Sequence, residues 1–261
     1  MAVLSAAKGA HWVISRKAIQ TGISGIEIVF RHECRTSTPV FNLITLYRHQ
    51  SQFFRINKYT ESYYDNLPTA QKTKFAVVYW LMLLLDIAIV ASELLFFFVW
   101  NRLADTDYEL AFYILDVISI SYSTLWYVIP MSQYFLCVYI LVQSLQNEVS
   151  HLHSEDLNTS KLQRIALNIR SILNVCDLVK DYYGVTVLLG FMCSILDFIF
   201  FPYVYVYITH LMKLSLLSEL AYKLSLGLVC GLATLSKLAH MYILFMVCEM
   251  FYEKVSGHII N

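Results

Sequence analysis

The chain has 261 residues, of which 58% are hydrophobic and only 15% are charged. Average soluble domains carry about 25% charged residues, and a chain of this length can build a core without such an apolar excess. The composition therefore predicts contact with lipid. The nineteen basic and nineteen acidic residues cancel, and no basic stripe is interleaved with aromatic residues, so nucleic acid is not an expected partner.

Residues 1–74 differ from the rest of the chain. They hold ten of the nineteen lysines and arginines, and none of their apolar stretches reaches spanning length. We expect a cytoplasmic segment. Its aromatic and basic stretch from Phe53 to Tyr64 suits a helix lying along the membrane surface, and it suits equally an ordinary helix leading into the first span.

Apolar runs of membrane-spanning length fill most of the remainder. The first, from Phe75 to Trp100, covers the ~30 Å hydrocarbon layer at ~1.5 Å per residue. The later runs are expected to be helices of the same bundle, because an open strand would leave backbone groups unpaired in lipid. The predicted spans are residues 75–100, 111–142, 182–208 and 220–248. The predicted fold is therefore an all-α membrane protein, with a bundle of four transmembrane helices over residues 75–261.

The second span contains Pro130. Proline removes one intrahelical hydrogen bond and crowds the preceding turn, which predicts a kink. In lipid the carbonyl left open needs another donor. That donor can come from a neighbouring segment of the bundle or from a nearby hydroxyl group. The candidate hydroxyls are those of Ser119, Ser121, Ser123, Thr124 and Ser132.

The connection after the second span carries an amphipathic pattern at about residues 160–181. Its apolar positions recur at helical spacing, and they are Leu162, Ile165, Ile169, Ile172, Leu173, Cys176 and Val179. We expect a long cytoplasmic helix that continues into the third span without a break. Its apolar stripe needs a partner, which is other cytoplasmic helices, a second subunit or the membrane surface.

Charge distribution predicts the orientation of the chain. Basic residues concentrate in residues 1–74 and in the connection after the second span, whereas the connections after the first and third spans hold few cations. By the positive-inside rule, the first two segments face the cytoplasm. Four spans then leave both chain ends cytoplasmic.

Several ionisable residues lie inside the predicted spans. They are Asp86, Glu93, Asp116, Asp197, Lys237 and His240. Each charge costs about 2.5–3.5 kcal/mol on insertion scales, so we expect these groups to face the bundle interior and to find partners. Lys237 is expected to pair with Asp197 or Glu93. Two interpretations remain open: a polar ligand pocket or ion path that includes Asp86, Glu93 and Lys237, and a set of interhelical tethers.

Motifs for catalysis or cofactor binding are missing from the sequence. It contains no glycine-rich nucleotide loop, no nucleophile elbow and no zinc-protease motif. The six cysteines include no CxxC pair. We therefore expect no enzyme, no cofactor and no metal site.

Two patches carry a resemblance to a known family. IALNIRSILNVCDLVKDYYGVTV, from Ile165 to Val187, and CEMFYEK, from Cys248 to Lys254, resemble the insect gustatory receptor family of chemoreceptors. The resemblance implies seven helices with a cytoplasmic amino terminus, an assembly of four subunits, and a ligand pocket that opens a cation pore. Aligned in this way, the four spans look like the third to the sixth of the family, and we expect a receptor that is incomplete at both ends.

The resemblance implies a gustatory-type chemosensory receptor in the plasma membrane, a ligand-gated cation channel that detects a small tastant as a homo- or hetero-oligomer. It extends the ligand-binding role to polar and aromatic positions in the outer halves of the spans, which are Glu93, Tyr122, Trp126 and Tyr203. Two alternatives remain. One is a secondary transporter, favoured by the intramembrane charges, and the other is a non-conducting regulatory subunit that associates through the apolar stripe.

Overall fold

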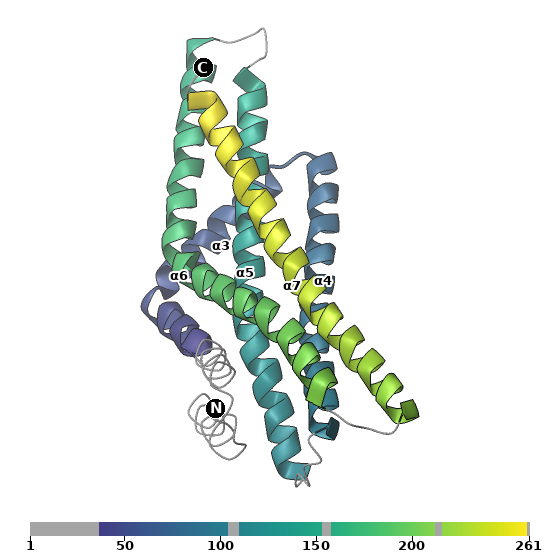
Figure 1. The fold of residues 1–261 in the computed structure, drawn as a ribbon. Coiled ribbons are helices and arrows are strands. Elements are labelled where there is room, and N and C mark those ends of the chain that lie inside the picture. The colour runs from purple at the N-terminus through teal and green to yellow at the C-terminus, as the bar shows by residue number, and fades with distance from the viewer. Residues whose placement is uncertain (1–36, 104–109, 153–157, 212–215, 260–261) are drawn as a thin grey trace. The chain divides into compact units, whose positions relative to one another are not determined.

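The computed structural model describes residues 37–103, 110–152, 158–211 and 216–259, and nearly all of these residues are helical (Figure 1). The elements are α3 (Gln50–Asp65), α4 (Thr69–Leu103), α5 (Leu110–Leu152), α6 (Thr159–Leu211) and α7 (Leu216–Ile259). Residues 37–48 are a further helical stretch. No residue in the described ranges belongs to a β-strand. The predicted all-α fold is confirmed.

Each predicted span lies within one of the four long helices. Among the described residues, the stretches that are long and apolar enough to cross a membrane are Thr69–Val99, Ile120–Leu152, Thr159–Val206 and Lys223–Glu253. These lengths suit a ~30 Å hydrocarbon layer with residues to spare at the ends. The prediction of four such helices is confirmed.

Helix α6 joins two predicted elements into one. Residues 160–181 and the third span form a single helix of 53 residues, as expected from the absence of a break between them. Asn158 caps its start, because the side-chain oxygen accepts hydrogen bonds from the Lys161 backbone N–H at 2.9 Å and from the Ser160 hydroxyl at 2.8 Å. This is the position at which a helix needs an acceptor for its first free N–H groups.

The chain divides into two compact units. Each of the four long helices has one segment in unit 1 and another in unit 2. Unit 1 comprises residues 1–42, 84–129 and 188–241, and unit 2 comprises residues 43–83, 130–187 and 242–261. Helices α4 and α6 run from unit 2 into unit 1, whereas α5 and α7 run from unit 1 into unit 2.

In unit 2, helix α3 packs against α5 and α6. The Thr60 hydroxyl lies 3.9 Å from the Cys137 sulfur of α5. The Tyr63 hydroxyl is 3.0 Å from that of Ser171 on α6, and the Phe53 ring lies 5.8 Å from the Tyr182 ring of α6. Helix α3 is therefore part of the fold of unit 2.

The apolar stripe of α6 is partly covered by the protein's own helices. Ile165, Ile172 and Val179 are buried, whereas Leu162 is 51% exposed. On the flank of the stripe, the Asn168 amide donates to the Glu148 carboxylate of α5 at 3.1 Å. Neighbouring helices of the same chain are therefore one partner of the stripe.

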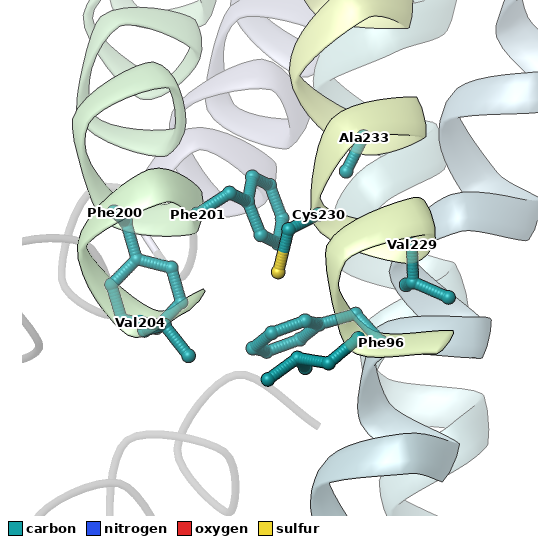
Figure 2. Close-up of a cluster of buried hydrophobic side chains, with 8 residues drawn as sticks. Phe96, Phe200, Phe201, Val204, Val229, Cys230 and Ala233 are labelled. Carbon is teal, nitrogen blue, oxygen red and sulfur yellow. The ribbon is translucent and has the colours of Figure 1, made fainter. Parts of the chain in front are cut away.

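Unit 1 has an apolar core drawn from three helices (Figure 2). Its buried members are Phe96 of α4, Phe200, Phe201 and Val204 of α6, and Leu226, Val229, Cys230 and Ala233 of α7. The Phe96 ring meets the Phe201 ring edge-on, with 5.0 Å between centroids. Such an edge-to-face pair adds about 0.5–1.5 kcal/mol to the burial of the two rings.

The carbonyl opened by Pro130 has a donor that the sequence analysis did not name. In a regular helix the N–H of residue 130 would bond the Trp126 carbonyl; here the Asn42 side-chain amide donates to that oxygen at 2.5 Å. The hydroxyls of Ser121 and Ser123 bond the carbonyls of Val117 and Ile120 in their own turns. A neighbouring segment of the chain thus supplies a donor to this carbonyl, which is one of the two sources that were expected.

Candidate functional site

Three of the intramembrane charges meet in unit 1. The Lys237 ammonium on α7 donates to the carboxylates of both Glu93 on α4 and Asp197 on α6. The three side chains are only 1%, 3% and 0% exposed, respectively. We call them the charged cluster. The predicted pairing of Lys237 with Asp197 or Glu93 is confirmed, and it includes both carboxylates at once.

The charged cluster lies one helical turn from the apolar core. Ala233 precedes Lys237 by four residues on α7, Phe201 follows Asp197 by four on α6, and Phe96 follows Glu93 by three on α4. Residues at these spacings share a helix face. The apolar core therefore forms one wall of the charged cluster, because the same helix faces carry both.

Two aromatic rings flank the ammonium group. The Lys237 Nζ lies 5.0 Å from the centroid of the Phe201 ring and 6.0 Å from that of Tyr127, which is on α5. Rings at this range attract a cation through their negative faces. All four long helices thus contribute to the surroundings of one ammonium group.

The charged cluster has an unequal charge balance. Two carboxylates face one ammonium, so the three side chains carry a formal excess of one negative charge when all are ionised. Carboxylate oxygens accept several hydrogen bonds each, so two carboxylates around one ammonium suit a proton or a ligand group that is cationic or donates hydrogen bonds.

A second pair extends the polar face. Asp86 and Glu93 are seven residues apart on α4, and His240 follows Lys237 by three on α7. The His240 Nε2 lies 3.9 Å from the Asp86 carboxylate, and His240 is buried. The two form an ion pair only when the imidazole is protonated. Unit 1 therefore holds two groups of ionisable side chains, the charged cluster and the Asp86–His240 pair.

No protein-family model, curated protein or solved structure matches this chain. The resemblance to gustatory receptors thus rests on its two sequence patches. Both patches, residues 165–187 of α6 and 248–254 of α7, belong to unit 2. The charged cluster belongs to unit 1, so it has to be interpreted from its own geometry.

The six predicted ligand-binding residues separate into two groups. Glu93 and Lys237 belong to the charged cluster, and Asp86 lies beside His240. The aromatic members are more peripheral: the Tyr122 and Trp126 rings pack together at 5.7 Å, while Tyr122 and Tyr203 are 36% and 38% exposed. These two side chains do not share the burial of the charged cluster.

The sequence analysis named no aromatic partner for Lys237. The rings that face the ammonium are Phe201 and Tyr127. Phe201 had a usable signal, because it lies four residues from Asp197 and so shares its face. Tyr127 had none, since its orientation depends on how α5 is rotated. Asp116 has a side chain outside the part of the chain that can be described.

Within the described ranges, no group of three or more histidine, cysteine, aspartate or glutamate side chains is placed to hold a metal ion. The side chains of the charged cluster can form ion pairs and hydrogen bonds and can exchange protons.

Proposed function

We propose that this chain is a chemosensory receptor of gustatory type in the plasma membrane, and that the charged cluster is where a small tastant acts. The observation that carries the proposal is the Lys237 ammonium held between Glu93 and Asp197, all three buried. Isolated charges within spans are rare and mark ligand or ion sites by default. The two gustatory-type patches supply the receptor assignment.

A ligand would act by competing for these contacts. One ammonium connects α4, α6 and α7, so a tastant that satisfies Glu93 in place of Lys237 would remove the ionic contact between α4 and the other two helices. A ligand shifts a conformational equilibrium only by binding one state better than the other. The excess carboxylate favours ligands with an amine or another hydrogen-bond donor.

The remaining parts of the proposal follow the sequence patterns. The basic residues of the leading segment and of the connection before α6 support a cytoplasmic location for both chain ends. A homo- or hetero-oligomer, a tetramer by family resemblance, would carry the cation current.

A secondary transporter is the second candidate, and one observation favours it. The Asp86–His240 pair and the charged cluster together place five ionisable side chains on facing helices. Chains of such groups serve as proton relays in transporters. The regulatory-subunit alternative has less to support it, because the α6 stripe through which it would associate is buried at Ile165, Ile172 and Val179, although Leu162 is 51% exposed.

Expression in cells separates the candidates. Tastant-evoked current from this chain alone supports a self-sufficient receptor, whereas uptake that depends on an ion gradient, without current, supports a transporter. A current that changes only when a full-length receptor is co-expressed supports the subunit. Asp197→Asn tests the charged cluster, and Asp177→Asn, at an exposed position of the same helix, is the matched control.

A further inference from the structure

The helical stretch of residues 37–48 has its polarity inverted. Two of its polar residues, Thr38 and Asn42, are buried, with 0% and 6% exposure; Ser37 and Arg48, at the two ends of the stretch, are exposed. Its large apolar residues Val40, Phe41, Leu43 and Ile44 are between 41% and 45% exposed. A helix at a water-facing surface shows the opposite arrangement, with polar residues outward and an apolar stripe toward the core.

The inward polar face contacts the middle of two membrane spans. The Asn42 amide donates to the Trp126 carbonyl of α5, and the Thr38 hydroxyl lies 3.9 Å from the Cys193 sulfur of α6. Trp126 and Cys193 are near the centres of the predicted spans 111–142 and 182–208. The stretch that starts at residue 37 therefore begins at the depth of the hydrocarbon layer.

Hydrocarbon also explains why the polar side chains point inward. Away from water, amide and hydroxyl groups need protein partners, and an apolar side chain is stable against acyl chains. A helix lying on the headgroup layer would instead turn its polar residues outward. The exposed apolar face of residues 37–48 thus has the chemistry of the lipid-facing sides of the spans.

We propose that residues 37–48 form an additional membrane-embedded helix whose exposed face, at Val40, Phe41 and Ile44, contacts lipid acyl chains. Its length is about 18 Å at ~1.5 Å per residue, less than the ~30 Å layer, so this stretch enters the membrane without crossing it alone. The inference replaces, for these residues, the expectation that all of residues 1–74 lie in the cytoplasm. It is independent of the proposed receptor function.

Photochemical crosslinking tests the proposal on the full chain. Phe41 is replaced by p-benzoylphenylalanine, the protein is reconstituted into phosphatidylcholine vesicles, and the products of illumination are identified by mass spectrometry. Lys58, which is exposed on α3, receives the same photoreactive residue as the control. The expected result is adducts to acyl-chain carbons from position 41, at least ten times more abundant than from position 58.

Every other outcome overturns the proposal. Adducts confined to the headgroup would place the helix on the membrane surface. Crosslinks to a second copy would show that protein covers this face. Equally low yields of lipid adducts at positions 41 and 58 would indicate that water does. Ile44 carries the same photoreactive group in a second variant, and the far-ultraviolet circular dichroism of each variant is compared with that of the parent protein. A correctly folded variant without acyl adducts at either position counts against the inference.

Discussion

Replacing Lys237 by methionine should destabilise the protein far more than removing either of its partners. The substitution keeps a side chain of similar volume but removes the positive charge between Glu93 and Asp197. Two buried carboxylates would then face each other without a cation. Glu93→Gln instead makes the formal charge of the cluster neutral, because it leaves one carboxylate opposite one ammonium.

The magnitudes follow from burial. Removing one partner of a buried ion pair costs about 3–5 kcal/mol, because the remaining charge is left uncompensated, and all three groups are at most 3% exposed. Glu93→Gln loses one charged hydrogen bond but also the excess charge, so we expect about 1 kcal/mol or less. The triple variant Glu93→Gln, Asp197→Asn, Lys237→Met should recover most of the loss caused by Lys237→Met.

The free energy of unfolding is measured on purified protein in detergent micelles, by tryptophan fluorescence during a denaturant titration. Lys180→Met, at an exposed position of α6, is the matched control and should change stability by about 0.5 kcal/mol or less. If Lys237→Met is no more destabilising than Glu93→Gln, or if the triple variant is no better than Lys237→Met, the charge balance argued for this cluster is wrong.

Two further predictions concern backbone contacts. Asn42→Ala should lower the free energy of unfolding by about 1–3 kcal/mol, because the Trp126 carbonyl loses its side-chain donor. The loss should be smaller in a Pro130→Ala background, where the backbone N–H of residue 130 can bond that carbonyl. Equal losses in both backgrounds would contradict the pairing. Gly231→Ala should stabilise α7 by up to about 1 kcal/mol, because an added methyl meets open space there. Gly227→Ala should gain less, because the methyl would lie 3.0 Å from an aromatic ring of α6; thermal unfolding of both variants checks the difference.

The sequence predicted the features that follow from solvation alone. Long apolar runs have to be helices in lipid, so the four long helices were predictable, and so was the continuity of α6 through Lys180 and Tyr182. The partners of Lys237 were predictable because the cost of a buried charge leaves few alternatives to the carboxylates Glu93 and Asp197.

The features that were missed depend on how each helix is rotated and which segment packs beside it. Periodicity within α5 does not indicate that Tyr127, rather than Tyr122, faces Lys237. The donor to the Trp126 carbonyl is Asn42, which is 84 residues away in the chain, and no local pattern connects the two. Residues 37–48 are too few to span a membrane, so their length gave no reason to place them in one. That Asn42 is buried while Phe41 is exposed depends on the helices that pack beside this stretch.

Current recorded from cells expressing the chain, alone and with a full-length gustatory-type receptor, is the most direct test of the proposed ligand site. A panel of small tastants that includes amines is applied to the parent protein, to Asp197→Asn and to the control Asp177→Asn, with surface expression matched. The account predicts a tastant-evoked current whose half-maximal concentration shifts at least tenfold in Asp197→Asn and stays unchanged in Asp177→Asn. Identical responses in both variants, or the absence of any evoked current in either setting, would contradict it.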